Sequence, residues 1–379
     1  MTRPLKIGVS CYASAGGSGI VATELGLALA ERGHEVHFIT ASVPFRVHLG
    51  QERVSVHTVE TLDYPLFEHP PYTLALAVKM HQVASFHGLD LLHVHYAIPH
   101  AASAILASQM GSRRIPVVTT LHGTDITLVG NHPSYHRITR WSIEQSDRVT
   151  AVSDFLASET RRIFRTDKKI HTIPNFVDTA RFSPRSADGL RARFAKNGER
   201  ILLHASNFRP VKRALTLVDI LAAMEERERT VLLLAGDGPE LAALEYKARE
   251  LGLGRQVKIV GAWERIEELL PVADVYLQPS EHESFGLAAL EAMSCGVPVV
   301  VTSRGGPSEF IRDGENGFLL DPSDLGAWAA RCDALLRDES LRRRVGLAGR
   351  ASVEEGFPLP RVIDRYEELF QNLMASKVD

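Results

Sequence analysis

Two series of short apolar runs, separated by helical patterns, constrain the fold of this chain most strongly. The first series begins at Leu5, Val36, Val54, Leu89, Val117, Val149 and Ile170. The second series begins at Ile201, Val231, Val257, Ala273 and Val297. Apolar strands that alternate with helices form parallel sheets whose two faces are both covered. The sequence therefore predicts an α/β protein with two parallel sheets.

The length of the chain supports two domains. Its 379 residues exceed the roughly 250–300 at which single cores stop growing. Prolines and glycines punctuate a polar stretch between Asn175 and Gly198, where we place the join. We predict a first domain over 1–180 and a second over 181–357. An apolar stripe within 361–375 predicts a terminal helix over 358–379, which can pack back on the first domain.

Composition narrows the classes of function. A net charge of −3 argues against nucleic-acid binding, which needs a strongly basic face. No apolar run approaches the 18 or more residues of a membrane span, and residues 1–6 lead directly into a strand. The three cysteines lie far apart, without the paired spacing of a disulfide framework or a zinc site. We therefore expect a cytoplasmic protein.

The stretch from Glu283 to Glu291 carries two carboxylates eight positions apart, with a glycine near the first. The order of strand, loop and helix predicts a helix from about Ser284, so the carboxylates lie about 12 Å apart along it. The start of such a helix, beyond the carboxyl end of a strand, favours anionic ligands. The two glutamates can reach two polyols, as a nucleotide sugar offers. The alternative is a pair of solvated surface glutamates.

A basic pair follows the first strand of the second series. Arg209 and Lys212 lie three residues apart, shortly after Asn207. Arginine binds phosphate oxygens through two parallel hydrogen bonds, and lysine adds a compact charge. The pair suits a diphosphate, although charge in such a loop is often only solvated.

A glycine-rich loop follows the first strand. Gly16 and Gly17 precede Ser18 at the start of a helix, where backbone can approach an anion closely. The spacing does not match a dinucleotide-binding fingerprint. The alternative is a plain tight turn.

Histidines gather at the ends of two first-domain strands. His93 and His95 share one face of a strand and could form half a metal site, but we favour two hydrogen-bonded histidines because no third ligand stands out. His122 ends another strand and precedes a glycine turn. Its alternative is a core or helix-capping histidine.

Together these motifs resemble the retaining glycosyltransferases of family GT4, whose signature is a Glu-x7-Glu element. The resemblance covers nearly the whole chain. It implies the GT-B fold, in which two Rossmann-like domains face each other across a cleft. It also implies a nucleotide-sugar donor, with no metal and no other cofactor.

The resemblance also implies roles for the motif residues. In the family, Glu283 would orient the donor hexose, Glu291 would bind ribose, and His122 would contact the sugar near the reacting carbon. Arg209 and Lys212 would offset charge on the diphosphate. We expect front-face substitution, and leave a short-lived covalent intermediate open. The expected catalytic residues are His122, Arg209, Lys212 and Glu283; the expected donor-binding residues are Gly16, Gly17, Asn207, Phe285, Gly286, Leu287, Ala288 and Glu291.

Within the family, residues 11–26, 92–100 and 121–127 resemble enzymes that transfer N-acetylglucosamine from UDP-GlcNAc to the hydroxyl of L-malate, the first step of bacillithiol biosynthesis. Ser18, Tyr96 and Thr124 would then hold the acceptor, while the cation for its carboxylates stays open. The alternatives are a family transferase with a sugar, lipid or inositol phosphate acceptor, a UDP-GlcNAc 2-epimerase of the same fold, and a two-lobed sugar-binding protein. A homodimer is left open.

Overall fold

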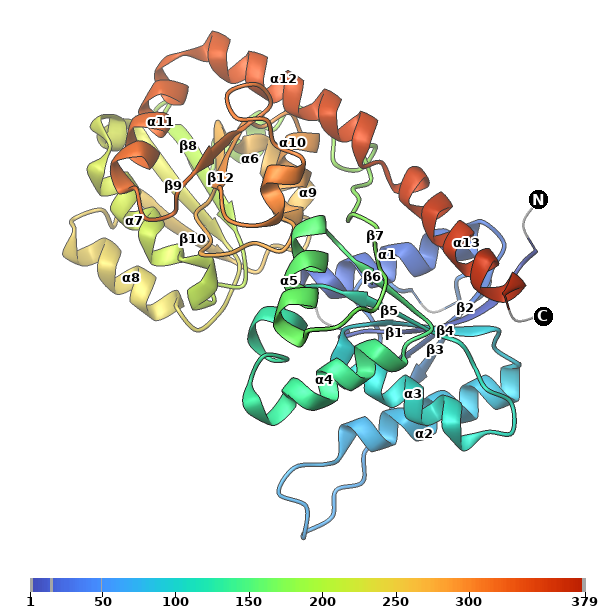
Figure 1. Cartoon of the computed structure of the whole chain (residues 1–379). Coiled ribbons are helices and arrows are strands. Elements are labelled where there is room, and N and C mark those ends of the chain that lie inside the picture. Colours follow the sequence, from blue (N-terminus) through green and yellow to red (C-terminus); the bar gives the residue numbers. More distant parts are fainter. Residues whose placement is uncertain (1–2, 14–15, 49, 377–379) are drawn as a thin grey trace. The chain divides into compact units, whose positions relative to one another are not determined.

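The computed structural model describes residues 3–13, 16–48 and 50–376 and divides the chain into two compact units (Figure 1). Unit 1 comprises residues 1–175 and 360–379, and unit 2 comprises residues 176–359. The domain boundary predicted from the sequence, at 180/181, lies five residues after the boundary in the structure. The chain was predicted to return to the first domain at 357/358.

Unit 1 is built on a seven-stranded parallel sheet in the order β3-β2-β1-β4-β5-β6-β7. The chain builds outward from β1 to β3, then returns to the other side of β1 to add β4. Ligands of such sheets bind where the order reverses, beyond the carboxyl ends of β1 and β4. The strands are β1 (Lys6–Ser10), β2 (Glu35–Thr40), β3 (Val54–Thr58), β4 (Leu91–His95), β5 (Val117–Leu121), β6 (Arg148–Ala151) and β7 (Ile170–Thr172).

Helices cover this sheet, and the last of them comes from the end of the chain. Helix α13 (Leu359–Ala375) places the Tyr366 hydroxyl 3.3 Å from Thr120 Oγ1 and packs the rings of Tyr366 and Phe370 on His93. Burying a side chain such as Phe370 contributes roughly 1.5–3 kcal/mol. The other helices are α1 (Gly17–Glu31), α2 (Tyr72–His87), α3 (Ala102–Met110), α4 (Pro133–Gln145) and α5 (Asp154–Phe164), with short turns η1 (Ala97–Ala101) and η2 (Thr124–Leu128).

Unit 2 repeats the same strand logic in the order β10-β9-β8-β11-β12-β13, again all parallel. Its reversal lies between β8 and β11. The sequence predicted five of these strands and missed β13, a run of only three residues. The strands are β8 (Arg200–Ala205), β9 (Thr230–Ala235), β10 (Val257–Gly261), β11 (Val275–Gln278), β12 (Val299–Thr302) and β13 (Phe318–Leu320).

The core of unit 2 lies between the sheet and its helices. Leu202, Leu277 and Val300 of the central strands are fully buried, as is Trp328, whose ring nitrogen donates to the Asp321 carbonyl. Among the described residues, no helix combines the length and apolarity that a membrane crossing needs. The helices are α6 (Asp188–Arg191), α7 (Ala214–Ala223), α8 (Leu241–Glu250), α9 (Ile266–Leu269), α10 (Leu287–Ser294), α11 (Leu325–Arg337) and α12 (Glu339–Gly356), with turns η3 (Pro210–Lys212), η4 (Glu225–Arg229), η5 (Leu270–Val272) and η6 (Gly306–Glu309).

Candidate active site

The centre of the unit 2 site is an ion pair between two predicted residues. Lys212 ends the turn η3 after β8, and Glu283 lies in the loop after β11, so both follow the strands that flank the reversal. Lys212 Nζ donates to Glu283 Oε2 at 2.8 Å. The same oxygen accepts hydrogen bonds from Gln278 Nε2 at 2.6 Å and Ser280 Oγ at 3.1 Å.

These three donors decide the charge of Glu283. Its side chain is only 12% exposed, and burial alone would raise its pKa. The charge and hydrogen bond of Lys212, with the bonds from Gln278 and Ser280, outweigh burial and hold the pKa below the ordinary value. Glu283 is therefore a fixed carboxylate at neutral pH. All three bonds reach Oε2, which leaves Oε1 to accept from a ligand hydroxyl.

A glycine pair that the sequence reading left without a role holds the backbone of Glu283. The Gly306 N–H donates to the Glu283 carbonyl at 2.8 Å, and the Glu283 N–H donates to the Arg304 carbonyl at 3.2 Å. A Cβ on Gly305 would lie 2.1 Å from the Glu283 oxygen, and one on Gly306 would lie 2.3 Å from the Ser284 oxygen. Only glycine permits this approach. The signal in the sequence was the Gly-Gly doublet after an apolar strand.

An ionic network ties the same loops together. Arg213 contacts Glu281 at 2.5 Å, and Arg304 contacts both Glu281 and Asp321. Arg213 adjoins Lys212, and Arg304 adjoins the glycine pair. The hydrogen bond from Arg213, with the charge of both arginines, lowers the pKa of Glu281. A network of this kind has no short sequence motif, so it could not be predicted from the sequence.

Helix α10 begins at Leu287, three residues later than the sequence predicted. Gly286 takes φ +103 and ψ 46, a left-handed conformation that keeps the preceding residues out of the helix. Phe285 is buried against Phe310 and Phe357. The free N–H groups at the helix start therefore belong to Leu287 and the residues after it, including Ala288. Glu291 lies within α10 and is 8% exposed.

Arg209 and Asn207 lie in the β8 loop and are both exposed. Arg209 makes no side-chain hydrogen bond or ion pair to any described residue, so it is available to a ligand. Glycines in the loop after β9 pack closely against the loop after β8. A Cβ on Gly238 would lie 1.9 Å from the Asn207 carbonyl oxygen, and a Cβ on Gly236 would lie 1.8 Å from the Ser206 carbonyl oxygen.

In unit 1, the three predicted acceptor residues come together. Ser18 Oγ donates to the Tyr96 hydroxyl at 2.9 Å, and Thr124 hydrogen-bonds the same hydroxyl. Burial raises the pKa of Tyr96 to about 12, so the phenol stays protonated. Tyr96 also holds φ +86, an unusual conformation for an aromatic residue. Three elements thus converge on one polar cluster: α1, the end of β4 and the turn η2.

Asp125, which the sequence reading passed over, fixes this convergence. Its carboxylate accepts from the N–H groups of Ala97 at 3.0 Å, His122 at 3.1 Å and Gly123 at 2.9 Å. Burial raises the pKa of Asp125 to about 6, and these donors offset part of that effect. One side chain therefore joins the segments that follow β4 and β5.

His122 pairs with His95 rather than with an acid. His95 Nδ1 lies 2.8 Å from His122 Nε2, and burial lowers the pKa of His122 to about 3, so its ring is neutral. His95 Nε2 is buried and has no hydrogen-bond partner among the described residues. An unpaired buried N–H is rarer than an unpaired acceptor, so we place the His95 proton on Nδ1. His122 then accepts at Nε2 and can donate from Nδ1.

His93 is hydrogen-bonded within the core of unit 1. Its Nε2 hydrogen-bonds Thr120 Oγ1 at 2.8 Å under helix α13, as the favoured interpretation held. Within the described residues, His93 and His95 belong to no group of three metal-ligating side chains.

The start of α1 offers a second set of donors. Gly16 precedes the helix with φ −75, so its conformation does not itself require glycine. The Ile20 N–H donates to the Gly16 carbonyl at 3.0 Å, and no side chain of the described residues caps the N-terminus. The N–H groups of Gly17, Ser18 and Gly19 thus have no partner within the helix and suit an anion. Residues 14 and 15 of the predicted loop lie outside the described residues.

Comparison with known families covers both units. The family described as "Glycosyltransferase Family 4" matches residues 15–181, and "Glycosyl transferases group 1" matches residues 188–352. N-acetyl-alpha-D-glucosaminyl L-malate synthase of Bacillus anthracis is 45% identical over 98% of this chain and 97% of its own length. D-inositol 3-phosphate glycosyltransferase of Xylanimonas cellulosilytica is 30% identical over 89% of this chain and 87% of its own.

Solved structures share the fold. Sucrose-phosphate synthase from Thermosynechococcus elongatus superposes with a TM-score of 0.85 at 23% identity, covering 99% of this chain and all of its own. HepE from Anabaena, solved with UDP and glucose, superposes with a TM-score of 0.83 at 22% identity, covering 97% of this chain and all of its own. The expected fold class, two Rossmann-like α/β domains of the GT-B type, is confirmed.

Proposed function

The chain belongs to the glycosyltransferases of family 4, and from that membership we propose that it transfers N-acetylglucosamine from UDP-GlcNAc to the hydroxyl of L-malate with retention at the anomeric carbon. The observation that carries the proposal is the 45% identity, over almost the full length of both chains, to a GlcNAc-malate synthase. The product is GlcNAc-malate, with UDP released, as in the first step of bacillithiol biosynthesis.

Unit 2 binds the donor in this proposal. Lys212 and Arg209 contact the diphosphate, supported by the free N–H groups at the start of α10. Glu283 presents Oε1 to hexose hydroxyls, while Glu291 binds ribose. The fixed negative charge of Glu283 supports its role in orienting the sugar, because a carboxylate that already accepts three hydrogen bonds is a poor nucleophile.

Unit 1 binds the acceptor. The Ser18, Tyr96 and Thr124 cluster offers hydroxyls to the malate hydroxyl and carboxylates. The amides at the start of α1 supply favourable electrostatics for a dianion, whose Arg or Lys partner stays open. His122, neutral and with Nδ1 available, donates to the donor sugar near the reacting carbon.

The transfer step follows from these placements. The bond from the anomeric carbon to the β-phosphate oxygen breaks, and its electron pair stays on the phosphate. The malate hydroxyl oxygen bonds the same face of the anomeric carbon, and its proton passes to the departing phosphate. Lys212 and Arg209 stabilise the charge that grows on the diphosphate, so they act on the transition state more than on the ground state.

The test is UDP release from UDP-GlcNAc with a panel of acceptors: L-malate, D-malate, inositol 3-phosphate and water. We expect L-malate to give the fastest release and GlcNAc-malate as product. Release with L-malate no faster than with water would refute the acceptor, and inositol phosphate as the best acceptor would favour the function named for the second relative. Formation of UDP-ManNAc from donor alone would instead indicate an epimerase.

A further inference from the structure

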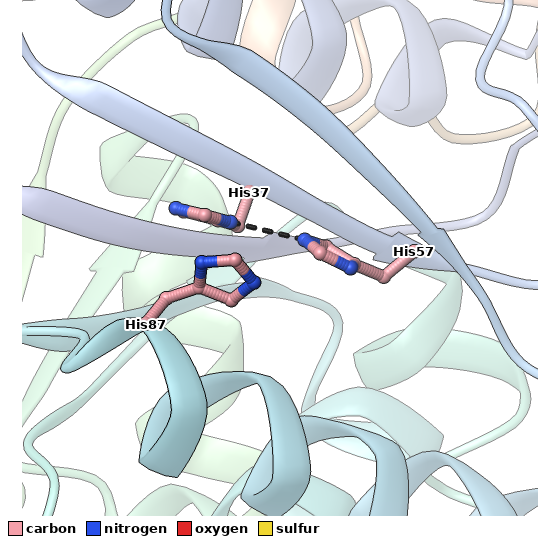
Figure 2. Close-up of side chains that lie close together, drawn as sticks. All are labelled: His37, His57 and His87. Atoms are coloured by element: carbon pink, nitrogen blue, oxygen red, sulfur yellow. Dashed lines mark hydrogen bonds between the residues drawn. The ribbon is translucent and has the colours of Figure 1, made fainter.

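Apart from the residues proposed for transfer, three histidines of unit 1 bring their rings together (Figure 2). His37 comes from strand β2, His57 from strand β3, and His87 is the last residue of helix α2. Each offers a ring nitrogen, and the three nitrogens all lie within 4.8 Å of one another. No other set of three metal-ligating side chains comes this close in the part of the chain that the structure describes.

Hydrogen bonds around His37 prepare it as a ligand. Its Nε2 lies 2.9 Å from Glu35 Oε1, and its Nδ1 lies 3.0 Å from His57 Nε2. The carboxylate fixes the His37 proton on Nε2, which leaves the lone pair of Nδ1 directed toward the other two rings. Metal-binding histidines commonly donate their second nitrogen to a carboxylate in this way, which orients the ring and raises its basicity. Lys6 holds the other Glu35 oxygen at 3.1 Å.

We propose that His37, His57 and His87 bind a divalent transition metal of the zinc class through three imidazole nitrogens, with a fourth position open to solvent. Nitrogens on a tetrahedral zinc ion lie about 3.3 Å apart at bonds of 2.0–2.1 Å. His37 and His57 already lie near that spacing. His57 and His87 are partly exposed, so small side-chain rotations bring the third nitrogen into range.

The surroundings of the cluster support the assignment. An open hollow of about 580 Å³ reaches His57 and His87 and gives an ion a path of entry. Lys79 also lines the hollow and opposes a cation there. The other lining residues are Gln82, Val83, Ser85 and Phe86.

The position of the site indicates its role. β3 is an edge strand of the unit 1 sheet, and its residues are mostly half-buried. A metal held by all three histidines would tie this strand to β2 and to the end of α2, which stabilises the folded chain because the unfolded chain has no preformed site. His87 precedes the amino end of β4, whereas the residues proposed for transfer follow the carboxyl ends of their strands. The inference therefore stands independently of the proposed reaction.

The experiment uses the full chain without an affinity tag, stripped with EDTA and dialysed. Titration with Co²⁺ followed by visible absorption, and with Zn²⁺ by calorimetry, should show one equivalent bound and a rise in melting temperature. His57→Ala and His87→Ala should each weaken binding at least tenfold. His69→Ala, which removes an exposed histidine between β3 and α2, is the matched control and should bind like the wild type.

Two further variants test the surroundings of the metal. Glu35→Gln should weaken binding about 10–100-fold, as loss of an outer-shell carboxylate does elsewhere. Lys79→Gln should tighten binding, most clearly at low ionic strength. The proposal is overturned if the wild type binds no metal above the background of the double variant His57→Ala/His87→Ala, or if the single variants, folded by circular dichroism, bind as the wild type does.

Discussion

The ammonium of Lys212 and the carboxylate of Glu283, 71 positions apart in the chain, meet at 2.8 Å beside the strand reversal of unit 2. The lysine therefore has two effects. In the proposed reaction it offers positive charge to the diphosphate, and in the fold it keeps a poorly exposed glutamate ionised. Removing Lys212 should reduce both effects, and measuring activity as a function of pH distinguishes one from the other.

Lys212→Met should lower turnover at least tenfold, a loss of about 1.4 kcal/mol of transition-state stabilisation. It should also raise the pKa of Glu283, because burial then acts with less opposition. Activity of the variant should consequently fall at a higher pH on the acid side than activity of the wild type. The measurement is the pH profile of UDP release; parallel profiles would show that Lys212 does not set the charge of Glu283.

The lowered pKa of Glu283 also determines how its contribution to the stability of the fold depends on pH. The folded pKa of Glu283 lies below its ordinary value of 4.5. Its ionised form therefore stabilises the fold above that pH, and the contribution disappears as the pH falls through the folded pKa. Urea unfolding of wild type and Glu283→Gln should differ less in strong acid than at neutral pH.

Arg209→Ala should also lower turnover at least tenfold, but it should leave the melting temperature unchanged. Arg209 is exposed and bonds no described side chain, so its loss removes no contact within the fold. Arg255→Ala, at another exposed position of unit 2, is the control for a change of net charge. Equal rates for the two variants would remove Arg209 from the site.

Gly305→Ala should reduce both stability and activity. The new Cβ would lie 2.1 Å from the Glu283 carbonyl oxygen, and Gly305 has φ +104, so the loop that carries Glu283 must shift. Gly254→Ala is the control, since nothing lies within 4 Å of its added Cβ. Melting curves and steady-state rates test the pair. A Gly305 variant with control-like values in both would show that the glycine pair does not position Glu283.

Tyr96→Phe should raise the KM for L-malate several-fold while leaving UDP affinity unchanged. The substitution removes the hydroxyl that joins Ser18 and Thr124 and keeps the ring. Tyr135→Phe, at an exposed position of α4, controls for loss of a phenol elsewhere in unit 1. Steady-state kinetics measure the KM for L-malate, and UDP titrations measure the affinity for UDP. An unchanged KM, or a matching loss of UDP affinity, would place Tyr96 outside the acceptor site.

Transfer should survive EDTA, because the proposed step uses Lys212 and Arg209 to offset the charge of the leaving group. Initial rates before and after chelation, each with and without added Mg²⁺, test this. A chelated enzyme that regains activity only with Mg²⁺ would contradict the step. If a metal occupies the site of His37, His57 and His87, chelation should lower the melting temperature of the same samples. The transfer rate and the melting temperature therefore report on different parts of the molecule.

Much of the fold was predictable because the buried strands of a parallel sheet appear in the sequence as continuous apolar runs. All seven runs of the first series became strands of unit 1. The missed strand, β13, is three residues long and only partly buried, so it leaves little periodic signal. The start of α10 was predicted at about Ser284, three residues too early, because the left-handed conformation of Gly286, which delays the helix to Leu287, is not evident from the sequence pattern.

The candidate site was predictable where one residue type suits one chemistry, as with Lys212 and Glu283. The sequence did not predict the residues that hold them. Gln278 holds the Glu283 carboxylate through a side-chain hydrogen bond, and Gly305 allows a close approach to the Glu283 backbone. In unit 1, Asp125 likewise joins separate segments through its side chain. The histidine cluster was missed because its members lie 20 and 30 positions apart on three elements. The sheet register pairs His37 with Ser55 and Ile39 with His57, so the two histidines lie diagonally across neighbouring strands.

Helix α13 completes unit 1 from the far end of the chain, since the backbone leaves this unit after Asn175 and returns at Pro360. The ribosome therefore releases unit 2 as one unbroken segment, ready to fold as it emerges. Unit 1 must wait, with His93 and Thr120 lacking their cover, until helix α13 has cleared the exit tunnel. Unit 1, whose first strands are synthesised before unit 2, is thus completed only after unit 2.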